Sequence, residues 1–218
     1  MAARKLVHIV DDEHAIRRST SFMLQTAGYA VRTWPTGAAF LKEVRQAPEG
    51  CVLLDIRMPD MDGIAVQQRL VAGGIAIPVI VLTGHADVSI AVQAMKAGAV
   101  DLLEKPFGKA ALIASIEAAF DRMTTTNGAA VRAARANRLL DVLTRREREV
   151  LDRLARGLQN KAIARDLGIS PRTVEVHRAN LMIKLDVRSL SEALRLVFAA
   201  GISADGSTRS ACIRKTPR

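Results

Sequence analysis

The sequence contains few aromatic residues, few cysteines and no long apolar segment, and each shortage narrows the class of protein. Aromatic residues make up 3% of the 218 residues, so Leu, Ile, Val, Ala and Met must fill its cores. Cys51 and Cys212 form neither a metal motif nor a disulfide framework, and we expect one buried and one exposed thiol. No apolar run is long enough to span a bilayer, and the N-terminus lacks a signal-peptide profile. The sequence therefore predicts a soluble cytoplasmic protein.

Excess charge of either sign is absent from the first 123 residues, whereas the remainder is strongly basic. Residues 1–123 contain 13 Lys or Arg and 13 Asp or Glu, and residues 124–218 contain 19 and 9. The entire net charge of +10 thus lies in the C-terminal part. This asymmetry indicates either a polyanionic partner for that part or a basic surface that only keeps the protein in solution.

Short apolar runs alternate with helical patterns as far as residue 123. The strands are expected at 6–10, 29–33, 51–54, 78–82 and 101–104. The helices are expected at 13–27, at 37–44 after Thr36 as N-cap, and at 63–72, 87–97 and 109–123. Five strand–helix repeats predict an α/β doubly wound, five-stranded parallel sheet with helices on both faces. In such sheets, functional sites form at the carboxyl ends of the strands.

The alternation of strands and helices stops at residues 124–128, and from residue 139 onward the patterns are helical only. The sequence therefore divides into four parts. Residues 1–123 form the first domain, and residues 124–138 are a linker or a helical extension. Residues 139–201 are expected to form a small all-α domain with a helix-turn-helix, and residues 202–218 a disordered basic tail. The expected N-caps in the helical domain are Thr144, Asn160, Ser170 and Ser189, with capping boxes at the first and last, and the expected helix ends are Gly157, Gly168 and Gly201.

Polar residues follow four of the predicted strands at the same edge of the sheet. Asp11 and Asp12 follow the first strand, Asp55 the third, Thr83 the fourth and Lys105 the fifth. Because three converging carboxylates repel one another, we expect a hard cation there, and Mg²⁺ suits oxygen ligands. A carboxylate can accept a phosphoryl group as a nucleophile, while ammonium and hydroxyl groups contact the phosphoryl oxygens. The pattern therefore predicts a phosphoryl-transfer site.

Residues 6–122 resemble the receiver domains of two-component response regulators, through the motifs at 10–13, 54–63, 82–85 and 104–107. The resemblance implies a flavodoxin-like fold in which a sensor histidine kinase phosphorylates Asp55. It implies that Asp12, Asp55 and the Arg57 backbone carbonyl are Mg²⁺ ligands, and that Asp11 contributes through water. It also implies phosphoryl contacts from Thr83 and Lys105, and a cis peptide bond between Lys105 and Pro106.

The chain departs from the receiver pattern three positions before Lys105. Receivers usually have an aromatic residue there, which turns inward when the switch threonine moves. This chain has Leu102, so the relay from Thr83 either is weakened or depends on the packing of Leu102 alone. His85, which flanks the site, is expected to modulate access of phosphate rather than to act as a base.

The helix that follows Ser170 is the expected DNA-recognition helix. At 100° per residue, Val174, Leu181 and Leu185 share one face, which we expect to be the core. The other faces supply the expected DNA contacts, which are Arg172, Thr173, Glu175, Val176, Arg178, Ala179, Asn180 and Lys184. Asn160 and Lys161, at the start of the preceding helix, are expected to contact phosphates.

Residues 142–199 resemble the LuxR-type DNA-binding domain, through the segments 143–151, 160–164 and 170–178. Together with the receiver motifs, this arrangement is similar to response regulators of the FixJ type. The resemblance implies a transcription factor that is not a dedicated enzyme and does not contact membranes. Phosphorylation would favour a homodimer through residues 87–123, which binds double-stranded promoter DNA and activates transcription with RNA polymerase. In the resting state the receiver would cover the other domain.

Three alternatives remain from the sequence. The first is a constitutive DNA-binding regulator with a weakly coupled receiver, which the departure at Leu102 makes conceivable. The second is a Mg²⁺-dependent phosphohydrolase, but such enzymes place the nucleophile on the first strand and a second aspartate two residues later. The third is a helical interaction protein that does not bind DNA, against which the basic charge of residues 124–218 counts.

Overall fold

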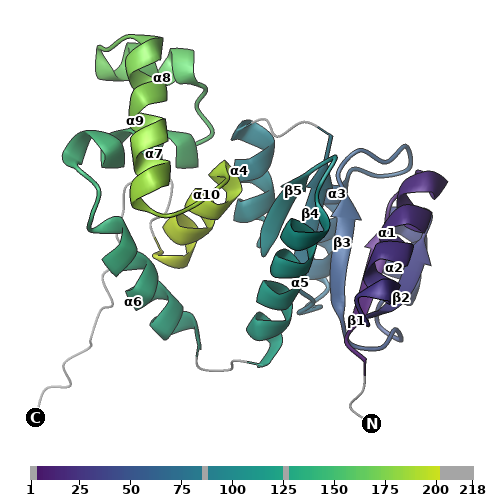
Figure 1. The fold of residues 1–218 in the computed structure, drawn as a ribbon. Coiled ribbons are helices and arrows are strands. Elements are labelled where there is room, and N and C mark those ends of the chain that lie inside the picture. Colours follow the sequence, from purple (N-terminus) through teal and green to yellow (C-terminus); the bar gives the residue numbers. More distant parts are fainter. Residues whose placement is uncertain (1–3, 85–87, 125–127, 202–218) are drawn as a thin grey trace, which may run out of the picture.

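The N-terminal half consists of a parallel sheet between two helical layers (Figure 1). The computed structural model describes residues 4–84, 88–124 and 128–201. The strands pair in the order β2-β1-β3-β4-β5, so β2 and β5 are the edges. They are β1 (Leu6–Val10), β2 (Ala30–Trp34), β3 (Cys51–Asp55), β4 (Val79–Thr83) and β5 (Asp101–Glu104). The helices of this half are α1 (His14–Thr26), α2 (Gly37–Glu43), α3 (Gly63–Ala72), α4 (Val88–Lys96) and α5 (Lys109–Thr124).

Side-chain alternation along the strands sends neighbouring residues to opposite faces of the sheet. Val7 and Ile9 pack with α1 and α5, where Leu24 and Leu112 are fully buried. Val10 instead packs with α2, α3 and α4, where Phe40 is fully buried. Because both faces are covered, β3 and β4 are buried along their whole lengths, as their continuous apolar sequences predict.

The expected strands and helices of this half are confirmed, with boundaries that differ by one residue at most ends. The helix α3 and the strands β1 and β5 have the expected bounds. Thr36 caps α2 by accepting a hydrogen bond from the Ala39 amide. The peptide bond between Lys105 and Pro106 is cis, as the resemblance implies.

The C-terminal half is entirely helical in its described residues. It consists of α6 (Gly128–Leu140), α7 (Arg145–Ala155), α8 (Asn160–Leu167), α9 (Pro171–Lys184) and α10 (Leu190–Ala199). Helix α6 occupies most of the segment that was expected to be a linker or a helical extension. Val174, Leu181 and Leu185 are buried, so the core face that was expected for α9, the predicted DNA-recognition helix, is confirmed.

Most of the expected caps in the helical half are present, and two differ. Thr144 forms a complete capping box with Glu147, and Ser170 caps α9. The N-cap of α8 is Gln159, so the prediction of Asn160 as the cap was wrong by one residue. Ser189 does cap α10, but the Glu192 carboxylate accepts the Arg188 amide, so the reciprocal half of that box is not formed.

The two halves share one continuous apolar cluster. Helix α10 contacts α4 and β5 of the first half and α6 of the second. Leu102 on β5 and Leu194 on α10 both belong to this cluster and are buried. A Cβ atom added to Gly157, which follows α7, would be 3.9 Å from Val92 of α4, so this turn also lies against the first half. Within the described residues, none of the helices has the length and apolar content needed to cross a bilayer.

Candidate functional site

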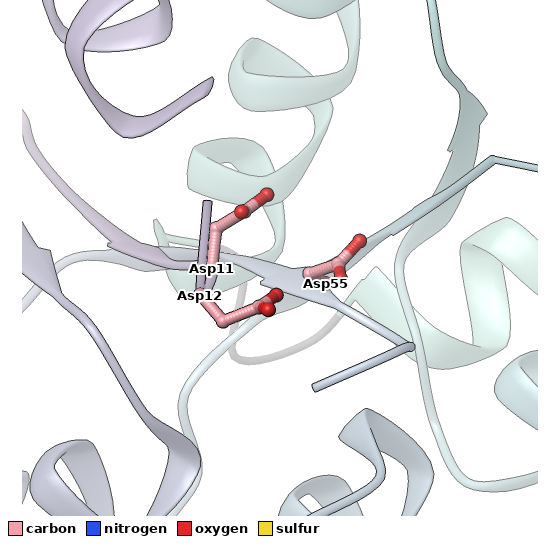
Figure 2. Close-up of side chains that lie close together, drawn as sticks. All are labelled: Asp11, Asp12 and Asp55. Carbon is pink, nitrogen blue, oxygen red and sulfur yellow. The ribbon is translucent and has the colours of Figure 1, made fainter. Parts of the chain in front are cut away.

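Three carboxylates meet at the carboxyl edge of the sheet, as the sequence predicts (Figure 2). Asp11 and Asp12 follow the end of β1, and Asp55 is the last residue of β3, which pairs with β1. One oxygen atom of each of the three side chains lies within 4.8 Å of the others. Asp11 and Asp55 are buried, whereas Asp12 is exposed. The cluster is therefore accessible to solvent at Asp12.

Lys105 binds two of these carboxylates. Its ammonium Nζ donates to Asp11 Oδ2 and to Asp55 Oδ1, both at 2.7 Å. Lys105 follows β5, and its backbone amide donates to the carbonyl of Thr83 at 2.7 Å. Thr83 ends β4 and is buried. The five residues predicted for the phosphoryl site thus gather at one edge of the sheet.

Burial and the ammonium act in opposite directions on the ionisation of this cluster. Burial raises the pKa of Asp55 above its usual value, while the bond and the charge of Lys105 oppose that rise. Burial alone would lower the pKa of Lys105, but its bonds to Asp11 and Asp55 outweigh burial and raise it. The lysine therefore stays protonated next to the acidic cluster, where it can contact an anionic group.

Close backbone packing holds Asp55 in place. The N-cap residue Asp62 begins α3 by accepting the Ile64 amide at 2.7 Å. Gly63 follows, and a Cβ atom at this position would be 2.2 Å from the backbone oxygen of Asp55. Only glycine allows α3 to begin so close to the end of β3.

The chemistry of the donor set fits Mg²⁺. The side chains supply only carboxylate oxygens, which are the ligands that this cation prefers, and too few of them to fill an octahedral shell. The remaining positions would be left for water or for a phosphoryl oxygen. Arg57, whose carbonyl is a predicted ligand, lies two residues after Asp55 and is exposed. The prediction for His85 concerns a residue outside the described ranges.

The recognition helix α9 presents most of its predicted contacts to solvent. Arg172 is 84% exposed at the side chain and pairs with Glu175 at 3.0 Å. Val176, Ala179, Asn180 and Lys184 are exposed as well, and Lys161 is exposed at the start of α8. Thr173 is half-buried, and its amide donates to the capping Ser170.

Three further predicted DNA contacts form hydrogen bonds within the domain, namely Asn160, Arg178 and Lys184. Arg178 donates to Asn160 Oδ1 at 2.8 Å, which joins α9 to the first residue of α8. Lys184 donates to Glu147 Oε2 at 2.8 Å, which joins the end of α9 to the start of α7. Burial opposes ionisation of Glu147, but bonds from Lys184 and Thr144 outweigh it and hold its pKa below the usual value.

Sequence reasoning missed several residues that position these sites. Arg17 donates to the backbone carbonyls of Asp11 and Asp12, at 2.7 and 2.8 Å, and so fixes the turn that carries them. Glu147 was predicted only as part of a capping box, not as the partner of Lys184. Nothing in the local spacing indicates that Arg17 binds these carbonyls or that Glu147 binds Lys184.

Comparison with known proteins gives a match in both halves. Residues 7–117 match the response regulator receiver domain, and residues 141–197 match the LuxR family of bacterial regulatory proteins. The transcriptional regulatory protein FixJ of Azorhizobium caulinodans is 45% identical over 203 residues, which are 93% of this chain and 96% of that protein. The tetrathionate response regulatory protein TtrR of Salmonella typhimurium is 41% identical and covers 87% of this chain and 90% of its own.

Among solved structures, full-length FixJ from B. japonicum covers 93% of this chain and 100% of its own, with 42% identity and a TM-score of 0.56. The matches therefore span both halves, and they agree with the parallel sheet, the acidic cluster and the helix-turn-helix. The chain belongs to the two-component response regulators of the FixJ type, in which a receiver domain precedes a LuxR-type DNA-binding domain that regulates transcription.

Proposed function

We propose that this chain is a transcription factor controlled by phosphorylation of Asp55 by a sensor histidine kinase. The observation that carries the proposal is the convergence of three carboxylates within 4.8 Å, with Lys105 bonded to two of them. Such a site needs little more than position and charge, because phosphoryl transfer depends mainly on both. The proposed Mg²⁺ ligands are Asp11, Asp12, Asp55 and the Arg57 carbonyl, and the bound ion would offset the charge of the transferred group.

The side chains have separate roles in the proposed transfer. A carboxylate oxygen of Asp55 attacks the phosphorus atom, and the bond from phosphorus to the histidine nitrogen of the kinase breaks. The Lys105 ammonium exchanges its bond to Asp55 for a phosphoryl oxygen, and the Thr83 hydroxyl donates to another. Both side chains then bind the phosphoryl group instead of their present partners, and this shift is the proposed signal.

We propose that the helical domain binds double-stranded promoter DNA through the exposed face of α9. The exposure of Arg172, Glu175 and Val176 supports this, as does the basic charge of residues 124–218. The proposed base and phosphate contacts are Asn160, Lys161, Arg172, Thr173, Glu175, Val176, Arg178, Ala179 and Asn180. Lys184, which was also predicted, is bonded to Glu147, and we propose that it positions α9 instead. Residues 1–123 and 139–201 are the proposed domains, and a cytoplasmic location accords with DNA binding.

We propose that phosphorylation regulates DNA binding by controlling whether two copies of the chain dimerise. The described part of the receiver leaves the outer face of α9 exposed, so it does not bury the DNA-reading surface. Helix α10 instead covers α4 and β5, which are part of the expected dimer face. Phosphorylation would free this face, and the homodimer would place two recognition helices on successive half-sites. The DNA-bound homodimer would then activate transcription together with RNA polymerase.

The test is phosphorylation of the full chain with acetyl phosphate and Mg²⁺, followed by measurement of labelling, dimerisation and DNA binding. We expect one stable label per chain, absent from Asp55→Asn and retained by Asp60→Asn, which changes an exposed carboxylate five residues away. Labelled protein should dimerise and bind DNA more tightly. Equal labelling of Asp55→Asn would refute the assignment of the phosphoacceptor, and rapid phosphatase turnover would favour the phosphohydrolase.

A constitutive DNA-binding regulator is the second candidate, and the leucine at position 102 is the observation that favours it. It would be supported if Asp55→Asn bound DNA and dimerised as the labelled wild-type chain does.

A further inference from the structure

Helix α10 of the DNA-binding domain contacts β5. This strand contains Leu102, at the position where receivers usually have an aromatic residue. The Ser191 hydroxyl donates to the backbone carbonyl of Leu102 at 3.1 Å, and both residues are buried. One turn further along α10, Arg195 Nη1 lies 3.3 Å from Asp101 Oδ2. Two adjacent residues of β5 are thus held by two residues of the other domain.

The bond from Ser191 belongs to a chain of hydrogen bonds that begins at the cap of α10. Glu192 donates its amide to Ser189 Oγ at 3.2 Å, and Ser189 Oγ lies 2.8 Å from Ser191 Oγ. A serine hydroxyl has one proton, and that of Ser191 goes to Leu102. Ser189 must therefore donate to Ser191. The chain of bonds connects the first turn of α10 directly to the backbone of β5.

Asp101 joins this contact to the rest of the receiver. Its Oδ2 accepts from Ser115 of α5 at 2.6 Å as well as from Arg195, and its Oδ1 accepts from the Leu102 amide at 2.9 Å. Both polar backbone groups of Leu102 therefore bond to side chains on the outer edge of the sheet. Because β5 is an edge strand, this side is free for another domain to bind.

The opposite end of the same short strand is part of the phosphoryl site. Leu102 pairs with Val81 in the sheet, and Glu104 pairs with Thr83. Lys105 follows directly and binds Asp55. Three residues of extended chain span about 10 Å. A movement of Lys105 towards a phosphoryl group therefore acts directly on β5, which α10 already holds. A movement of Thr83 acts on β5 through the pairing of Thr83 with Glu104, and neither route needs a side chain to rotate.

We propose that Ser191 and Arg195 sense the position of β5 and replace the aromatic relay that this chain lacks. They hold α10 on β5 while Asp55 is unmodified, and a shift of β5 on phosphorylation breaks their bonds and releases the helix. Leu102 contributes its carbonyl to this relay, whereas its side chain remains in the shared apolar cluster. The inference rests on the proposed function, because it assumes that Asp55 is the regulated site.

Release of α10 and binding of a phosphoryl mimic at Asp55 are thermodynamically coupled, so the affinity of the receiver for the mimic reports on the contacts of α10. If the bonds of Ser191 and Arg195 to β5 oppose the activated form, their removal favours release of α10. The affinity for a phosphoryl mimic at Asp55 must then rise by the same factor. One lost hydrogen bond or partly exposed ion pair corresponds to a change of about three- to tenfold. A purely structural role of Ser191 or Arg195 in α10 would weaken the DNA-binding domain and leave the receiver affinity unchanged.

The experiment titrates the full-length chain with beryllofluoride in the presence of Mg²⁺, by calorimetry. We expect Ser191→Ala and Arg195→Ala each to lower the Kd about three- to tenfold, and Arg188→Ala, an exposed arginine just before the helix, to leave it unchanged. Arg195 is partly exposed, so its variant keeps the test valid if Ser191→Ala unfolds. Wild-type Kd values in both variants would overturn the relay. Absence of binding by the wild-type chain would instead refute the proposed function, and the relay with it.

Discussion

Replacement of Lys184 tests whether this lysine contacts a DNA phosphate or only positions α9. Each phosphate neutralised by a protein cation contributes about 0.9 to the slope of log affinity against log salt. Lys184 lies on the flank of α9, but its ammonium is 2.8 Å from Glu147 Oε2. That oxygen also accepts the Thr144 amide and hydroxyl, each at 2.8 Å. Because Glu147 already neutralises this charge, we expect Lys184 to position α9 and to add little to the slope.

The perturbation is Lys184→Met, and the matched control is Lys161→Met, whose side chain is exposed at the start of α8. Loss of the lysine leaves a buried carboxylate with only the two Thr144 donors. The expected cost is about 1–2 kcal/mol, because a bond to a charged group contributes about 1.5–3 kcal/mol and Lys184 is partly exposed. For a domain of this size, the melting temperature should fall by roughly 5–15 °C.

Binding to duplex DNA of arbitrary sequence provides the assay, because the electrostatic part of binding does not depend on sequence. Affinity is measured at several salt concentrations, with all variants in the same state of phosphorylation. We expect the slope to be unchanged for Lys184→Met and to fall by about 0.9 for Lys161→Met. Over a fourfold range of salt, that difference is about 3.5-fold in affinity. A fall of about 0.9 for Lys184→Met with an unchanged melting temperature would refute the reasoning.

Three further predictions concern the receiver core. His8 is buried and neutral, accepts from Trp34 Nε1 and faces the Pro48 carbonyl. Burial lowers its pKa, so the unfolded chain takes up a proton first as the pH falls, and stability to urea should decrease below about pH 6.5 in the wild type but less in His8→Gln. Gly63→Ala should cost at least 1–3 kcal/mol and reduce labelling of Asp55, since its Cβ would meet a backbone oxygen; Gly108→Ala, with open space around its Cβ, is the control. The Cys51 thiol has a pKa raised to about 12 by burial, so in a Cys212→Ser chain iodoacetamide should react only after unfolding, and labelling of the folded chain would contradict this.

Much of the fold follows from the sequence because the responsible patterns are local. Continuous apolar strands, helix caps and glycines mark β3, β4 and most helices without reference to distant residues. The acidic cluster was also accessible, because parallel strands bring their carboxyl ends to one edge. The convergence of Asp11, Asp12 and Asp55 needed only the strand assignment and a sheet order that makes β1 and β3 neighbours.

The contacts that sequence reasoning missed join residues far apart in the chain. The Asn160 oxygen binds Arg178, and Asn160 lies inside α8 instead of capping it. No rule of helix periodicity relates an asparagine to an arginine 18 positions later. The contact between Ser191 and Leu102 depends on how the two domains dock. Docking is determined by the complementary shapes of the two surfaces, and not by the sequence around either residue.

The apolar cluster that the two halves share would favour aggregation if α10 were released from β5. If α10 left β5 as proposed, the edge of the sheet and the apolar side chains of α4 would lose their cover together. An uncovered edge strand next to an apolar patch is a template for uncontrolled self-association. Pairing with a second copy through this face would restore the cover, so the proposed dimerisation would protect the activated protein from aggregation as well as align it on DNA. A released chain that could not dimerise should precipitate as its concentration rises.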